Sequence, residues 1–79
     1  MDDLMLKNYI GRNIVTYRKH LRMTQAELAA RLNYSDKAVS KWERGIGLPD
    51  ITYFGKLALL LDTDTDSLLA GDVIHHDSR

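Results

Sequence analysis

Four polar side chains between residues 37 and 44 have types and spacing that suit contact with nucleic acid. They are Lys37, Ser40, Lys41 and Arg44. On a helical wheel these four span an arc of about 100°, opposite Val39 and Trp42. Lysine can donate hydrogen bonds to the O6 and N7 acceptors of guanine, and serine can bond to several base edges. Because the major groove of DNA admits an α-helix, the arc predicts base reading by Lys37, Ser40 and Lys41.

Asp36 lies at the edge of this arc, near the amino-terminal end of the predicted helix. A carboxylate there can accept a hydrogen bond from the amino group of cytosine, which makes Asp36 a further candidate for base reading. The same carboxylate can instead stabilise the start of the helix through the helix dipole. Both interpretations of Asp36 stay open from the sequence.

The segment before this helix carries the signals of another short helix and a tight turn. Thr24 and Glu27 have the spacing of a capping box, and apolar residues follow at helical intervals. Asn33 comes where the chain must turn, and asparagine tolerates a left-handed backbone. Ser35 can then cap the next helix. Two amphipathic helices joined in this way predict a helix-turn-helix over residues 24–45.

The rest of the chain is also helical in pattern. We expect a first helix over residues 7–21, and Gly45 should end the third helix in a left-handed conformation. Asp50 should cap a fourth helix, and Asp64 a short fifth helix that ends near Gly71. The expected buried positions are Ile10, Ile14, Tyr17 and Leu21 in the first helix, and Ile51, Phe54, Leu57, Ala58, Leu60 and Leu61 in the fourth. No segment alternates as a strand would, so we predict an all-α fold.

The length and composition fit one small domain. Seventy-nine residues with 44% hydrophobic content can bury a single core. We expect a domain over residues 1–71 and a short tail over residues 72–79, which shows no periodicity. No apolar run approaches the ~20 residues of a membrane span, and no signal peptide is recognisable. We therefore expect a cytoplasmic protein without membrane contact.

The net charge of zero conceals two segments of opposite sign. Residues 7–44 contain nine cations and three anions, whereas the remaining residues contain eight aspartates and only two cations. Such segregation is compatible with a solvated surface of incidental asymmetry. It is also the distribution expected if one side of the domain faces phosphates.

Several motifs together resemble a known family. Residues 24–29 read TQAELA, residues 40–45 read SKWERG and residues 48–50 read LPD, followed by Leu-Ala at residues 57–58. These motifs resemble the lambda-repressor-like (XRE-type) helix-turn-helix family of transcriptional regulators, from about residue 10 to residue 69. The resemblance implies a compact five-helix domain whose helices 2 and 3 form the helix-turn-helix.

The resemblance also implies roles for single residues. Gln25, in the first turn of the second helix, would contact a backbone phosphate, although a solvent-exposed helix starter is the alternative. Arg44 and Ser40 would contact a phosphate or a base edge. Arg18 would pair with Glu43 inside the domain, which would make Arg18 structural rather than a DNA ligand.

The chain also departs from the family pattern. Arg22, Asn33 and Asp62 stand where the family often has glycine, and Asp36 replaces a neutral polar residue at the start of the reading helix. The departures leave local turn geometry open. They also mean that no relative supplies the DNA sequence preference.

Other chemistry finds little support in the residues. There is no cysteine, no glycine-rich phosphate loop, and no serine, histidine and acid on neighbouring elements. His75 and His76 are adjacent but lack further ligands at metal-binding spacing. We expect a protein that is not an enzyme and that needs no cofactor or metal.

The sequence thus favours a sequence-specific regulator of transcription, a repressor, that binds double-stranded DNA. The alternative is a protein-interaction module of the same fold, such as an antitoxin or accessory factor, whose basic face binds an acidic partner. We expect a homodimer on DNA, because two reading helices give useful specificity where one covers few base pairs. The fifth helix with Val73 and Ile74 is the predicted dimer surface.

Overall fold

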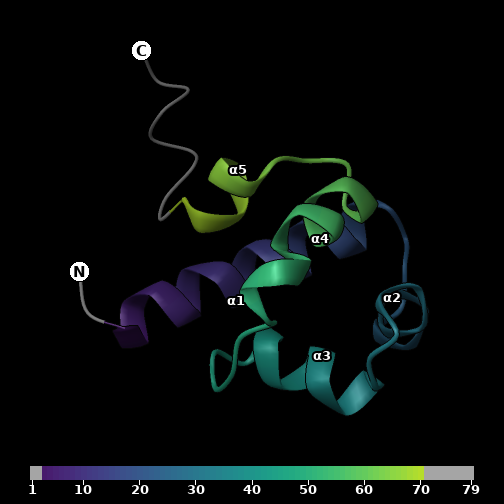
Figure 1. Ribbon diagram of the computed structural model, residues 1–79, viewed down its shortest axis with the longest axis horizontal. Helices are drawn as coiled ribbons and strands as arrows, with labels where there is room; N and C mark the ends of the chain where they lie inside the picture. The colour runs from purple at the N-terminus through teal and green to yellow at the C-terminus, as the bar shows by residue number, and fades with distance from the viewer. Residues whose placement is uncertain (1–2, 71–79) are drawn as a thin grey trace.

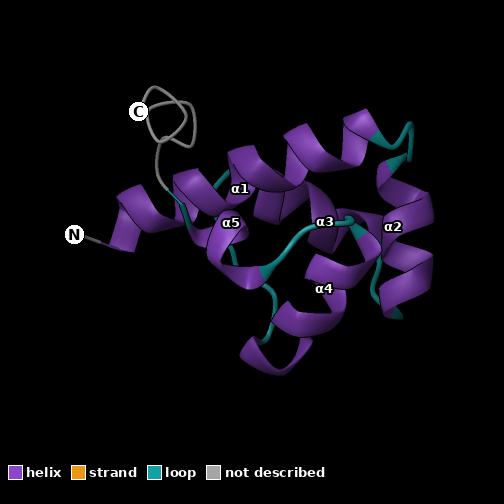
Figure 2. Cartoon of the chain, turned by 90° about the horizontal axis from the view of Figure 1, so that it is seen from above, coloured by secondary structure: helices purple, strands orange, loops and turns teal. Residues whose placement is uncertain are grey.

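Helices pack around a single core in the computed structural model, which describes residues 3–70 (Figure 1). They are α1 (Asp3–His20), α2 (Gln25–Leu32), α3 (Asp36–Glu43), the 3-10 turn η1 (Ile51–Tyr53), α4 (Phe54–Leu60) and α5 (Thr65–Leu69). Across these residues there is no strand, so the prediction of five α-helices is confirmed. In Figure 1, α5 lies above α1 and α3 lies below it, and Figure 2 shows α2 near the carboxyl-terminal end of α1.

The long helix α1 starts earlier than expected. Its first residue is Asp3, four residues before the predicted start near Lys7. The reason is that Leu6 continues the i, i+4 stripe of Ile10 and Ile14 and packs against the core. The buried face therefore extends one further turn towards the amino terminus.

The end of α1 corrects one predicted core position. Leu21 is 37% exposed, whereas Met23 is only 9% exposed and belongs to the core. Between them Arg22 has a left-handed φ of 58°, which turns the chain after α1. The turn directs Met23 rather than Leu21 inward, so the prediction of a buried Leu21 is wrong.

The helix ends around α2 and α3 follow the sequence signals. Thr24 and Glu27 form the predicted capping box, with Thr24 Oγ1 accepting from the Glu27 N–H at 3.0 Å. Asn33 has a φ of 64°, and its left-handed turn closes α2. Ser35 caps α3, and Gly45 at φ 76° takes the expected left-handed conformation just after it. The local geometry of the helix-turn-helix is thus encoded by short-range hydrogen bonds.

The fourth helix begins differently from the prediction. Asp50 caps the 3-10 turn η1 by accepting from the N–H and the hydroxyl of Thr52, both at 3.0 Å. This turn leaves Ile51 76% exposed, so its predicted burial is wrong. The core side of the segment is instead formed by Tyr53 and by buried Phe54. The rings of Tyr53 and Tyr34 meet edge-on, with their centroids 5.2 Å apart.

The short helix α5 is closed by a side chain from α1. Asp64 caps its start as predicted, accepting from the Ser67 N–H at 2.7 Å. At its other end, Asn13 Nδ2 donates to the carbonyls of Ser67, Leu68 and Ala70 at 3.2, 2.8 and 2.9 Å. These bonds satisfy carbonyls that a helix end otherwise leaves open. The predicted tail over residues 72–79, with Val73, Ile74 and the two histidines, lies outside the described residues.

Candidate nucleic-acid interface

The helix α3 rests on α1 at a point where only glycine fits. A Cβ added to Gly11 would collide with the carbonyl oxygen of Trp42 and lie 2.9 Å from that of Glu43. The backbones of α1 and α3 therefore touch directly at the carboxyl-terminal turn of α3. This contact fixes the depth at which α3 sits on the domain, and it was not predicted from the sequence.

The inner face of α3 (Val39, Trp42 and Glu43) is held within the domain. Val39 is fully buried, and Trp42 is 4% exposed with its ring edge-on to Tyr34 at 4.9 Å. Their inward direction was predicted from the helical period and is confirmed. Because this face is fixed by packing, the direction of the opposite face is fixed as well.

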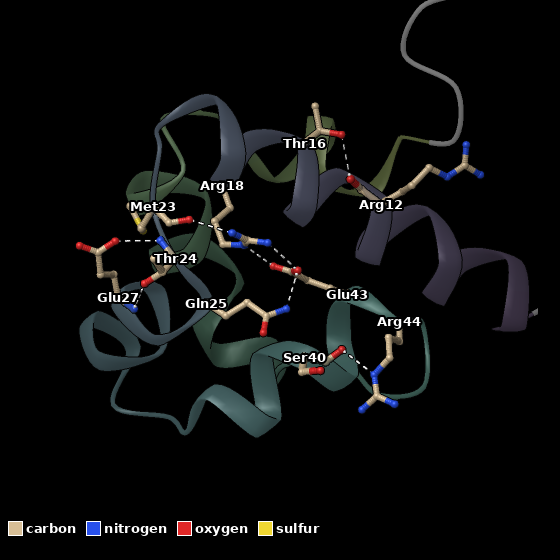
Figure 3. A network of polar contacts seen from close by, with 10 residues as sticks. All are labelled: Arg12, Thr16, Arg18, Met23, Thr24, Gln25, Glu27, Ser40, Glu43 and Arg44. Atoms are coloured by element: carbon tan, nitrogen blue, oxygen red, sulfur yellow. Dashed lines mark hydrogen bonds and ion pairs between the residues drawn. The ribbon is translucent and has the colours of Figure 1, made fainter.

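The Glu43 carboxylate is the centre of a buried polar network (Figure 3). Arg18 donates from Nε to Oε2 at 2.5 Å and from Nη2 to Oε1 at 2.9 Å, and its Nη1 bonds the Met23 carbonyl at 2.8 Å. The side chains of Arg18 and Glu43 are only 10% and 6% exposed. The hydrogen bond to Glu43 raises the pKa of Arg18, so the guanidinium stays charged. This two-point pairing joins α1 to the end of α3 and keeps the guanidinium of Arg18 inside the domain.

Gln25 belongs to the same network. Its Nε2 donates to Glu43 Oε1 at 2.9 Å, and its side chain is half-buried at the start of α2. In Figure 3, Arg18 and Gln25 converge on the carboxylate of Glu43 from different elements. From the sequence, Gln25 was predicted only to contact a phosphate, and its hydrogen bond to Glu43 was not predicted.

Unlike the inner face, the outer face of α3 (Lys37, Ser40, Lys41 and Arg44) lies at the surface of the domain. Lys37, Lys41 and Arg44 are exposed and Ser40 is half-buried. Arg44 Nε donates to the Ser40 carbonyl at 3.3 Å, which holds its stem along the helix and leaves the end of the guanidinium pointing outward (Figure 3). The ammonium groups of the two lysines form no ion pair or hydrogen bond within residues 3–70. The structure thus brings the four predicted residues onto one accessible surface, with exposed Asp36 at its end.

The first turn of α2 lies next to this surface. Gln25 is the first residue of α2, and its contact with Glu43 brings the start of α2 to the end of α3. A helix start presents backbone N–H groups and a positive dipole end, which suit an anion. The start of α2, with its N–H donors, and the outer face of α3, with its cations, therefore lie at one side of the domain.

A comparison with protein families identifies this arrangement. A family model described as helix-turn-helix matches residues 14–68, which is most of the chain. The chain belongs to this family. The match covers the predicted lambda-repressor-like (XRE-type) unit and supports DNA binding by a helix-turn-helix regulator.

Solved structures show the same fold within longer chains. The hydroxypropylphosphonic acid epoxidase from S. wedmorenis is 25% identical, with a TM-score of 0.78 over 85% of this chain and 36% of that chain. The iron(II) form of HppE with substrate and the apo form of HppE are each 26% identical, with TM-scores of 0.75 and 0.76. Those two matches cover 81% and 82% of this chain and 37% and 36% of the others. The helix-turn-helix chain thus spans little more than a third of these proteins.

No curated protein is significantly similar to this helix-turn-helix sequence. Over residues 3–70, no helix has the combination of length and apolar character that crossing a bilayer requires.

Proposed function

We propose that the chain is a sequence-specific transcriptional regulator, acting as a repressor, that reads the major groove of double-stranded DNA with the helix from Ser35 to Arg44. The observation that carries the proposal is the division of α3 into a packed inner face and an accessible, cationic outer face. Because α3 is held by Val39, Trp42 and Glu43, it can present its outer side chains to bases at a fixed angle.

The proposal assigns two kinds of contact. Base edges are read by Asp36, Lys37, Ser40 and Lys41. Phosphates are bound by Gln25 and Arg44, together with the backbone N–H groups at the start of α2. Neutralising about five phosphates would give a slope on the order of −4 when the logarithm of affinity is plotted against that of salt concentration.

The sharpest test compares two lysines of the same chain. Lys41 lies on α3, whereas Lys56 is an exposed lysine on α4. Duplexes selected from a random pool supply the specific site, and affinities are measured for that site and for random duplex. Lys41→Ala should weaken the specific site more than random duplex, because base contacts carry sequence information. Lys56→Ala should change neither affinity by more than about twofold. Equal losses on both duplexes for Lys41→Ala would contradict its base-reading role.

The regulatory direction needs its own test. A reporter gene controlled by the selected duplex should show lower expression when the protein is present. Higher expression would show that the protein is an activator and would leave the proposed DNA contacts unchanged.

We propose further that the protein binds its site as a homodimer, since two half-sites multiply the specificity of one reading helix. The proposed surface combines α5, whose Leu69 is 39% exposed, with the segment after it. Sedimentation of the full chain and of a chain ending at Gly71 tests this surface. Identical monomer masses for both, free and on DNA, would exclude a tail-mediated dimer.

The exposed cations of α3 also suit a second candidate function, because a cationic surface can bind an acidic protein as well as DNA. Since a similar fold forms about a third of an epoxidase chain, this fold also occurs as part of proteins other than isolated regulators. The second candidate is a protein-interaction module, an antitoxin or accessory factor, whose outer face binds an acidic partner. In either case we propose that this domain binds a partner in the cytoplasm and does not itself catalyse a reaction. Random duplex at low salt separates the candidates: retention supports DNA binding, and no retention favours the protein partner.

A further inference from the structure

An open cleft lies where the turn after α1, the side of α2 and the end of α4 meet. Its volume is about 310 Å³, at the lower end of the range of about 300–1,000 Å³ that small-molecule sites occupy. All three elements contribute to its lining, which consists of Leu21, Arg22, Met23, Glu27, Arg31 and Leu60. No residue of α3 is among them, so the cleft is separate from the base-reading residues proposed above.

The cleft combines apolar surface with two cations. Leu21 is 37% exposed and Leu60 is half-buried, so both leave part of an aliphatic side chain open to the cleft. The exposed side chains of Arg22 and Arg31 form no ion pair or hydrogen bond within residues 3–70. A guanidinium group matches the paired oxygens of a carboxylate or a phosphate. The lining therefore suits a molecule with an anionic head and a short apolar chain.

Glu27 is the one anion in this lining, and its carboxylate is already engaged. Its Oε1 accepts from the Thr24 N–H at 2.8 Å as part of the capping box of α2 (Figure 3). Two cations thus stand against one carboxylate that the helix start uses. The excess positive charge favours an anion in the cleft.

The backbone at Arg22 is an independent sign that its side chain has a role outside folding. Its φ of 58° is left-handed, a conformation that glycine adopts freely and other residues adopt at a cost. The other left-handed non-glycine residues between residues 3 and 70 are Asn33 and Asp62, whose short polar side chains tolerate this conformation better. Arginine lacks that local compensation, and backbone strain of this kind gathers at functional sites.

We propose that this cleft is a binding site for a small organic anion. The anionic head lies between Arg22 and Arg31, and a short apolar chain covers Leu21 and Leu60. Because such a ligand bridges the turn after α1, α2 and α4, it also stabilises the folded domain. The inference does not depend on DNA binding, since the site shares no residue with the outer face of α3.

The experiment follows the backbone amide and arginine Nε–H signals of the full chain at constant ionic strength. The probes are hexanoate and hexyl phosphate, two anions with the same six-carbon chain length. We expect a dissociation constant on the order of 1–10 mM for the better probe, with the largest chemical-shift changes at Arg22, Arg31 and Leu60. Acetate keeps only the charge and 1-hexanol only the chain, so each should bind about tenfold or more weakly.

Two glycine substitutions separate binding from folding. Arg22→Gly removes one cation and relaxes the backbone, so the protein should be at least about as stable as the parent. Its affinity for the better probe should fall about tenfold or more. Asp62→Gly is the matched control, because it relaxes another left-handed residue, also at φ 58°, that does not line the cleft. That variant should bind the probe within about twofold of the parent.

The outcomes that would overturn the inference are distinct from those that test DNA binding. No binding of either probe up to about 100 mM would overturn it, as would equal affinities for hexanoate, acetate and 1-hexanol. An Arg22→Gly protein that binds the better probe as the parent does would overturn it as well. If Arg22→Gly weakens binding to random duplex while neither probe binds, Arg22 is a contact to DNA phosphate and the cleft is not an anion site. Base reading by α3 stands or fails separately, on the comparison of Lys41→Ala with Lys56→Ala.

Discussion

The two faces of α3 differ in where their polar groups find partners. On the inner face, Glu43 binds Arg18 and Gln25 inside the domain. On the outer face, the ammonium groups of Lys37 and Lys41 bond nothing within residues 3–70. A buried charge depends on its partner, because removal of that partner leaves it uncompensated, whereas a charge at the surface is available for a partner. The same eight-residue helix thus divides its side chains between folding and recognition.

The largest expected effect separates the two faces by stability. Glu43→Ala leaves the buried Arg18 without its anion, so the free energy of unfolding should fall by roughly 3–5 kcal/mol. Lys41→Ala, two residues away on the outer face, should change it by no more than about 0.5 kcal/mol. Denaturant unfolding of both variants measures the difference. A Glu43→Ala protein as stable as the parent would show that the inner network does not hold the fold together.

A second prediction concerns the contact on which the inner face rests. Gly11→Ala would drive a methyl group into the carbonyl oxygens of Trp42 and Glu43, so the free energy of unfolding should fall by about 1–3 kcal/mol. The matched control is Gly55→Ala in α4, where an added Cβ meets no atom within 4 Å. Because alanine favours a helix over glycine, that variant should be more stable by up to about 1 kcal/mol. Equal effects of the two substitutions would contradict a close α1–α3 contact.

The smallest effect concerns carboxylates that cap helices at the surface. The backbone N–H of Ser67 lowers the pKa of Asp64, and that of Thr24 lowers the pKa of Glu27. A pKa that is lower in the folded state adds stability above about pH 4, the ordinary range of these groups, and this stability is lost as pH falls through the folded-state value. Asp64→Asn keeps a good cap at neutral pH but removes the titrating group. Its stability should therefore fall less than that of the parent between about pH 4 and pH 2, as followed by acid titration of the helical signal.

If Asp64→Asn and the parent lose stability equally as the pH falls, the Asp64 cap adds no pH dependence. Because this carboxylate is at the surface, high salt should reduce the difference between the two proteins. The inner network should be less sensitive to salt, since its ion pair is buried.

Sequence reasoning succeeded where a local signal determines the structure. Thr24 with Glu27 fixes the start of α2, and the left-handed Asn33 and Gly45 end α2 and α3 as expected. These features depend on hydrogen bonds or dihedral angles within a few residues. The outward direction of Lys37 and Lys41 follows equally from the helical period.

Sequence reasoning failed where an unexpected turn or a contact between distant residues decides which side chains are buried or bonded. Leu21 and Met23 are both apolar, and only the turn at Arg22 determines which of them is buried. Gly11 and Asn13 act across the domain, on the backbone of α3 and on the carbonyls of α5, so nothing beside them in the sequence indicates their roles. Gln25 was assigned to the site, but its bond to Glu43 spans 18 residues and required the structure.

The most direct test of base reading by the outer face follows backbone amide signals while the selected duplex is added to the protein. Base reading by this face predicts the largest chemical-shift changes at Lys37, Ser40 and Lys41, with smaller changes at the start of α2 and almost none in α4. Changes confined to α4 and α5, with α3 unaffected, would contradict it.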